Sequence, residues 1–177
     1  MRSRLFPSQI RWADLHLYFG CSLHEKQGKL AAMPGFDPTQ LPGDLAALYA
    51  LWQSKRQGRR MPARADFDLL ELRPWMGRLH LVAVEGDDGR YAVFATASAE
   101  RLGREMTGKR LTDYQPAQMA EQALQEHRDV LQAREPVFRE WNELYVDKPL
   151  HWWRLALPLA DDGETVDRYF VGLHFRG

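Results

Sequence analysis

Apolar residues recur at helical spacing once the chain passes residue 44. The residues that share this spacing of three and four are Leu45, Leu48, Tyr49, Leu51 and Trp52. The pattern predicts a helix over 44–57, with Asp44 capping its first turn and Gly58 following its end. A shorter helix is expected from Asp68, because Asp68 and Glu71 have the spacing of a capping box.

The pattern then changes to that of a hairpin. The run 79–85 is apolar and rich in β-branched residues, and 90–96 is expected to return beside it. The Gly and Asp residues of 86–89 tolerate the positive φ that a tight turn requires. Two short helical pieces, 99–102 and 111–114, are predicted to follow the hairpin.

A longer helix is predicted over 117–133. The residues expected on its inward face are Ala120, Leu124, His127, Val130 and Leu131. Three strands complete the chain, at 137–146, 150–159 and 168–175. The order of elements is therefore two helices, two strands, short helices, a long helix and three strands.

The last two strands alternate between large apolar residues and a mixed second set. On the more apolar face we place Trp153, Leu155, Val171 and Leu173, which leaves Trp152 and Phe170 on the opposite face. A strongly apolar face indicates a sheet that helices cover. We therefore predict an α+β fold: a five-stranded antiparallel sheet with helices on one face and an N-terminal helical extension.

Three regions are expected along the chain. They are a poorly defined extension at 1–41, N-terminal helices with a linker at 42–78, and the sheet domain at 79–177. Residues 1–32 show no clean period and precede a break rich in Pro and Gly. Either Met33 is the true start, or 1–32 is a loosely held extension.

Composition removes several functional classes. The 24 basic and 24 acidic residues cancel, so net charge predicts no nucleic-acid or membrane partner. A single cysteine, Cys21, rules out an intrachain disulfide and a CxxC metal site. No apolar run approaches the roughly 20 residues that a membrane helix needs. A cytoplasmic location is therefore expected.

Four segments resemble one known family. YALWQSKR at 49–56 leads into GRRMPARADFD at 58–68, and RLGREMTGKRL at 101–111 and LPL at 157–159 follow. Together with the order of elements, these segments make 42–177 similar to the PAS superfamily. The resemblance is to a short stand-alone subfamily found mainly in proteobacteria and once classed as a domain of unknown function. That subfamily usually carries Arg and Gly where this chain has Ala92 and Ala95.

The resemblance implies a non-catalytic sensory or regulatory module that binds a small molecule, a protein partner or both. A ligand would lie between the long helix and the inner sheet face. The residues expected to line that space are Val93, Leu124, His127, Trp153, Leu155, Val171 and Leu173. In a ligand-free domain the same positions would be plain core. Some relatives hold haem through a histidine on this helix, but the polar neighbours of His127 favour a structural role, and no cofactor is assigned.

The second face of the sheet also needs a cover. Trp152 and Phe170 are expected there, packed against Leu48 and Trp52 of the helix 44–57. That helix would come from the same chain or from a second subunit, so a homodimer is predicted, with packing within one chain as the alternative. Because 168–175 runs almost to the last residue, any signal is expected to pass through a separate partner or through oligomerisation.

Other functions are less well supported by the residues. The basic run at 55–64 lacks interleaved aromatic residues, so we interpret it as a helix end and loop paired with nearby acidic residues. No GxSxG, HExxH, P-loop or GxGxxG motif occurs, so no catalytic or metal-binding residue is predicted. The alternatives are a ligand-free adaptor and, less favoured, an enzyme on the cone-shaped fold of the nuclear transport factor type.

Overall fold

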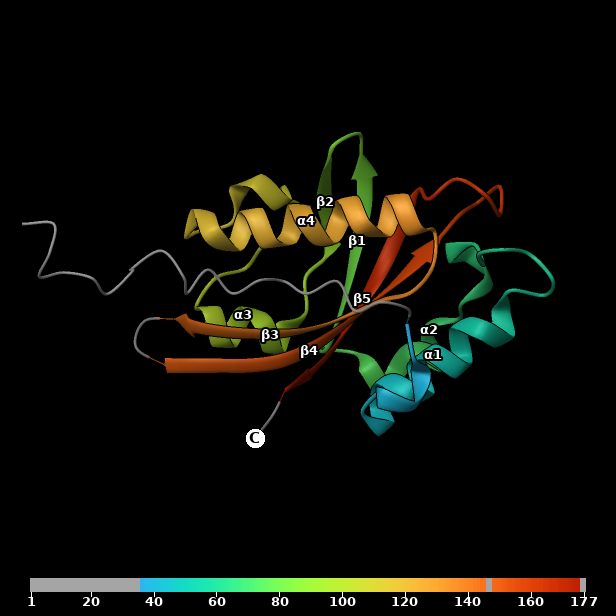
Figure 1. Cartoon of the computed structure of the whole chain (residues 1–177), viewed down its shortest axis with the longest axis horizontal. Helices are drawn as coiled ribbons and strands as arrows, with labels where there is room; N and C mark the ends of the chain where they lie inside the picture. The colour runs from blue at the N-terminus through green and yellow to red at the C-terminus, as the bar shows by residue number, and fades with distance from the viewer. Residues whose placement is uncertain (1–35, 146–147, 176–177) are drawn as a thin grey trace, which may run out of the picture. The chain divides into compact units, whose positions relative to one another are not determined.

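The computed structural model of the chain describes residues 36–145 and 148–175 (Figure 1). All of these residues belong to the unit Ala32–Gly177. The interpretations of 1–32 and of Met33 fall outside the described residues. Of the predicted extension 1–41, only 36–41 is described, and it contains the short 3₁₀ turn η2, Pro38–Gln40, capped by Asp37.

The described residues form one five-stranded antiparallel sheet. The strands are β1 Leu79–Glu85, β2 Asp88–Val93, β3 Val137–Tyr145, β4 Lys148–Leu159 and β5 Arg168–Phe175. Their order across the sheet is β2-β1-β5-β4-β3, so the first hairpin lies beside the last strand. The predicted division into two strands and then three is confirmed.

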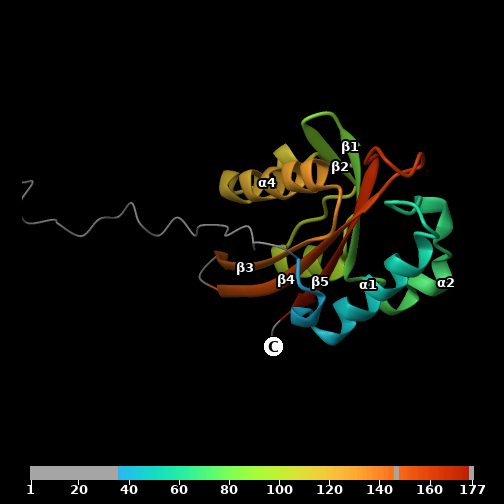
Figure 2. The same cartoon turned by 45° about the vertical axis from the view of Figure 1, so that its right-hand side comes forward.

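Helices cover both faces of this sheet. They are α1 Gly43–Lys55, α2 Leu69–Leu72, α3 Thr96–Leu102 and α4 Ala117–Ala133. Figure 2 shows α4 on one side of the sheet and α1 on the other. Helices on one face were predicted for the sheet domain, and α1, from the predicted N-terminal helices at 42–78, covers the other face.

The predicted bounds of the second strand, 90–96, were wrong at both ends. The chain re-enters the sheet at Asp88, directly after a turn in which Gly86 has a φ of 68°. β2 ends at Val93 because the N–H of Ala95 donates to Nδ1 of His80 at 2.9 Å, and α3 begins at the next residue. A side-chain acceptor distant in sequence therefore ends the strand.

The register between β4 and β5 decides which residues share a face. Leu155 pairs with Gly172, and Arg154 pairs with Leu173. Because directly paired residues point to the same face, Trp152 and Arg154 share the α4 face with Val171 and Leu173. The predicted alignment placed Trp153 and Leu155 on that face and was wrong by one residue.

α1 packs directly on the opposite face. Its residues Leu45, Leu48 and Trp52 are buried, and the indole N–H of Trp52 donates to the carbonyl of Pro158 at 2.8 Å. The close approach depends on Gly172, where a Cβ atom would lie 2.5 Å from Cδ2 of Leu48. Glycine therefore allows the helix to reach the sheet.

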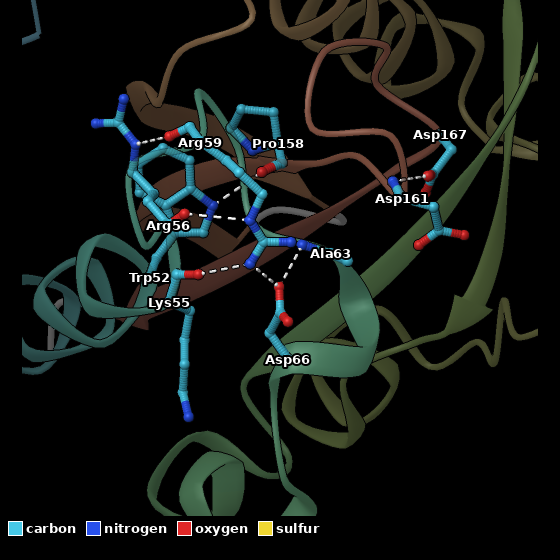
Figure 3. Close-up of polar contacts among 9 residues, drawn as sticks. All are labelled: Trp52, Lys55, Arg56, Arg59, Ala63, Asp66, Pro158, Asp161 and Asp167. Atoms are coloured by element: carbon cyan, nitrogen blue, oxygen red, sulfur yellow. Dashed lines mark hydrogen bonds and ion pairs between the residues drawn. The ribbon is translucent and has the colours of Figure 1, made fainter.

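The loop after α1 is held by its own charges (Figure 3). Arg59 donates through Nη2 to Oδ2 of Asp66 at 2.6 Å and to the carbonyl of Lys55 at 3.0 Å. The same Asp66 oxygen accepts the N–H of Ala63 at 2.7 Å. The backbone N–H of Ala160 donates to Pro62 at 3.0 Å, which ties the loop to the end of β4. The predicted pairing holds for Lys55 with Glu71 and for Arg59 with Asp66. Arg56 and Arg64 instead donate to backbone carbonyls.

Replacing Gly172 with Ala is expected to lower the free energy of unfolding by about 1–3 kcal/mol, because the added methyl overpacks the α1 contact. Gly43→Ala is the matched control, since no atom lies within 4 Å of a Cβ at that position. Urea unfolding of both variants measures the difference. Equal losses at the two positions would show that the close approach of α1 has no effect on stability.

Candidate functional site beneath and beside α4

The inward face of α4 combines apolar residues with two ionisable ones. The buried residues of the helix are Met119, Ala120, Ala123, Glu126, His127 and Val130. The helix begins after Pro116 and ends at Ala133, where Arg134 follows with a left-handed φ of 51°. The predicted bounds, 117–133, are confirmed. Glu126 and His127 must find partners inside the protein, because an unpaired buried charge is costly.

Glu126 forms a buried ion pair with Arg154 of β4. Nε of Arg154 lies 3.0 Å from Oε1 of Glu126, and Nη2 lies 2.6 Å from Oε2. Both side chains are only 2% exposed. The guanidinium group also lies 4.2 Å from the ring centre of Trp141. Burial opposes the charge on Arg154, but the facing carboxylate outweighs burial and raises the pKa of Arg154 above its ordinary value.

A second arginine beside this pair is only partly satisfied. Arg139 of β3 stands opposite Arg154 in the register and donates through Nη2 to Asp129 of α4. Burial, together with the charge of Arg154, lowers the pKa of Arg139. The buried side-chain atoms without a hydrogen-bond partner in the described part of the chain are Gln122 Oε1, Arg139 Nε and Nη1, Trp141 Nε1 and Trp152 Nε1. All of them belong to α4, β3 and β4.

His127 joins α4 to the hairpin and to β5. Its Nε2 lies 3.2 Å from the carbonyl of Gly86, and its Nδ1 lies 3.2 Å from the hydroxyl of Tyr169. Burial lowers the pKa of His127, so the neutral ring donates through Nε2 and accepts the Tyr169 O–H at Nδ1. Both ring nitrogens of His127 are thus engaged within the protein.

Two further buried groups complete the polar interior. Burial raises the pKa of Tyr91 to about 12, so its hydroxyl stays protonated between the side chains of Arg154 and Tyr114. His80 accepts the N–H of Ala95, and its Nε2 lies 3.3 Å from Oγ of Ser98. Burial, reinforced by the charge of Arg154, holds the pKa of His80 well below its ordinary value. Sequence patterns did not identify these contacts, since each joins elements distant along the chain.

A groove of about 660 Å³ opens beside this network. Phe36, Tyr49 and Phe138 contribute aromatic walls, and Asp129 and Arg139 also line it. Arg139 therefore belongs both to the buried network and to the groove. The groove lies at the edge of the sheet that β3 forms.

The predicted pocket residues do not form one lining. Val171 and Leu173 are buried on the α4 face, where His127 also packs, and Leu124 is half-buried on α4. Trp153 and Leu155 belong to the α1 face because of the one-residue register difference. Val93 is 49% exposed on β2, at the far edge of the sheet. The pocket that this set was expected to form is corrected accordingly.

The predicted second face is covered by the same chain. Leu48, Trp52 and Phe170 are buried there, and the ring of Phe170 packs edge-on against Phe67, 5.2 Å away. Trp152 lies on the other face, with its ring centre 5.6 Å from that of Phe175. The α1 cover therefore comes from within the chain, and these residues offer no surface to a second subunit.

The two positions that differ from the subfamily the sequence resembles lie in different surroundings. Ala92 is exposed on β2, whereas Ala95 is buried at the start of α3 and donates its N–H to His80. Among the described residues, no group of three or more His, Cys, Asp or Glu side chains is arranged to hold a metal ion. None of the described helices is long and apolar enough to cross a membrane.

Comparison with known proteins gives the family. A family model described as a PAS domain matches residues 42–174, well over half of the chain. The chain belongs to the PAS domain family. No curated protein and no solved structure matches it. Membership places this PAS domain among sensory and regulatory signalling modules, which are generally non-catalytic.

Replacing Glu126 with Ala is expected to lower the free energy of unfolding by about 3–5 kcal/mol, because Arg154 would remain as an uncompensated buried charge. The double variant Glu126→Leu/Arg154→Met should recover most of that loss, since no buried charge remains. Denaturant unfolding of Glu126→Leu, Arg154→Met and the double variant measures the coupling. Simple addition of the two single losses would contradict an ion-pair role.

The histidines make stability depend on pH. Burial lowers the pKa of His80 and His127 from the ordinary 6.5, so in this pH range the unfolded chain binds more protons than the folded chain. The free energy of unfolding should therefore be at its highest above about pH 6.5 and should fall as the pH decreases towards 5. Unfolding titrations at several pH values test this, and His127→Gln should have a shallower decline than the unchanged protein. An identical slope in both proteins would exclude a contribution from His127.

Proposed function

We propose that this PAS domain is a non-catalytic regulatory module that responds to a small molecule bound in the groove beside α4. One observation carries the proposal. The side chain of Arg139 is only 5% exposed, yet two of its nitrogens have no hydrogen-bond partner among the described residues. Buried polar groups are normally paired, and Arg139 lines the groove, so a bound acceptor that reached its guanidinium group would satisfy it.

The position of Arg139 also suggests how occupancy would be transmitted. Its bond to Asp129 joins the edge strand β3 to the last turns of α4. The neighbouring Arg154–Glu126 pair joins β4 to the same helix. A ligand that bonds to Arg139 would therefore favour one placement of α4 on the sheet over another.

A second candidate function is protein binding, and a separate observation favours it. Leu69 and Leu70 of α2 are 60% and 77% exposed, and Met76 shortly after them is 62% exposed. Neighbouring exposed apolar side chains are typical of interaction surfaces. This surface would serve a protein partner or a homodimer, in place of the face that α1 covers.

Native mass spectrometry of the full chain, purified gently from its own host, tests the small-molecule proposal. The unchanged protein should carry extra mass that is lost on denaturation. Ala133→Trp should remove this mass, because the exposed Ala133 lines the groove and an indole there would fill it. Ala117→Trp is the control, since it places the same side chain at the exposed first residue of α4.

The same spectra separate the two candidates. Extra mass that is equal in both Trp variants would place the ligand outside the groove and contradict the proposal. Subunits without extra mass that assemble as dimers, together with a dimer lost in Leu70→Ser, would favour the protein-binding function instead.

A further inference from the structure

Three aromatic side chains line the groove from the α1 side of the sheet. Phe138 of β3 pairs in register with Leu155, so it shares the face that α1 covers. Tyr49 of α1 and Phe36 line the groove as well, and their rings pack edge to face with centres 5.0 Å apart. All three side chains are half-buried, so each keeps part of its surface accessible. The groove therefore has an apolar wall that is rich in aromatic rings.

Two carboxylates line the same groove. Hydrogen bonds from Thr39 lower the pKa of Asp37, so this carboxylate is ionised at neutral pH. The hydrogen-bond partners of Asp37 among the described residues, Thr39 and Gln40, are both neutral. Glu135 is 51% exposed and lies 3.7 Å from Nε of Arg60, which is itself 39% exposed. Such an exposed pair contributes little, so both carboxylates can attract a further cation.

Arg139 lines the groove too, but it does not reverse the sign of the charge there. Its guanidinium group donates to Asp129, whose negative charge cancels that of Arg139. The two unpaired nitrogens of Arg139 are buried, and the register places this residue on the α4 face, away from the aromatic wall. Asp37 and Glu135 then remain as the uncancelled charges among the residues that line the groove. The groove therefore carries a negative surplus and favours a cation.

The aromatic wall and the carboxylates together select the kind of cation. Aromatic rings attract a cation that lies over their faces, and alkylated ammonium groups are recognised in this way. Because such a group has few or no N–H donors, it needs the charge of a nearby carboxylate more than a free acceptor. The oxygens of Asp37 already accept from Thr39 and Gln40, so they suit this kind of cation better than a primary ammonium group.

We propose that the groove binds a small organic cation through an alkylated ammonium group. The ammonium group lies against the rings of Phe36, Tyr49 and Phe138, and the carboxylates of Asp37 and Glu135 balance its charge. The groove volume of about 660 Å³ lies in the range of about 300–1,000 Å³ typical of small-molecule sites and leaves room for the rest of the molecule. This assignment rests on the proposed small-molecule function of the groove and names the class of its ligand.

Ligand-detected NMR titrations of the full chain, first freed of bound ligand by dialysis, test the class. The probes are choline, the neutral isostere of choline in which a carbon atom replaces the nitrogen, and ethanolamine, which carries a primary ammonium group. Choline should bind about tenfold more tightly than either of the others, because it alone combines a permanent charge with methyl groups that pack on the rings. Equal binding of choline and its neutral isostere would overturn the cation assignment. Equal binding of choline and ethanolamine would overturn the alkylated class.

A ring substitution then locates the binding site. Phe138→Leu removes an aromatic ring and keeps an apolar side chain, so it should weaken choline binding about threefold to tenfold. Phe175→Leu is the matched control, since it makes the same change at a half-buried position of β5 that does not line the groove. Unchanged choline binding in Phe138→Leu, or an equal loss in the two variants, would contradict the site.

A charge substitution tests the carboxylate, and it decides should Phe138→Leu fail to fold by circular dichroism. Asp37→Asn should weaken choline binding about twofold to fivefold, with a smaller loss at about 0.5 M salt. Asp162→Asn is the matched control. Asp162 is also exposed and also accepts from a backbone N–H two residues further on, that of Glu164 at 2.8 Å, but it does not line the groove. Equal choline binding by these two variants would overturn the proposal.

The two levels of inference can fail separately. Extra mass in native spectra that Ala133→Trp removes, with no preference for choline over its neutral isostere, overturns the ligand class and leaves the small-molecule function in place. Absence of extra mass and absence of titratable binding overturn both. Protein that binds phosphatidylcholine vesicles but not free choline would indicate a lipid head group and overturn the small-molecule source. Extra mass that matches an alkylated ammonium compound supports both levels.

Discussion

The interior of this PAS domain is organised around one ion pair, Glu126–Arg154. A guanidinium and a carboxylate that are both 2% exposed would each be costly to bury alone, so they require the helix and the strand to meet in one register. The pair sets the rotation of α4 over the sheet. Its neighbours then follow: His127 faces the hairpin and Tyr169, and Asp129 faces Arg139. Polar contacts therefore fix the orientation of α4 on the sheet, while apolar residues pack around these contacts.

The opposite face is closed by different means. α1 approaches through apolar packing on Gly172, and Asp44 at its start accepts from Arg78 at 2.9 Å and lies 2.6 Å from Nδ1 of His174. The following loop is held by Arg59 and Asp66. Both faces are thus covered within one chain. The β3 edge differs from them, because a groove opens there beside a strand that has a described neighbour on one side only.

Near that edge, some buried polar atoms of the described residues have no hydrogen-bond partner. Arg154 and Tyr91 are well paired, yet two buried nitrogens of Arg139 have no hydrogen-bond partner within the described part of the chain. Buried polar groups of folded proteins are normally paired, so Arg139 is an exception in this network. Under the proposed function, a ligand at Arg139 would act on the Arg139–Asp129 bond that joins β3 to α4.

The sequence by itself determined the elements and their order, because helical and strand periodicity are local. The helix over 117–133, the two-plus-three strands and the α+β class follow from spacing alone, and the segments at 49–68 and 101–111 resembled the family that the comparison then showed. Only the tertiary structure decided which faces meet. Alternation in β4 and β5 does not fix their mutual register. The sequence prediction therefore assigned Leu155 and Trp152 each to the wrong face. The site depended on that decision, since Arg139, Arg154, Glu126 and Asp129 carry no common motif and come together only when α4 crosses the sheet.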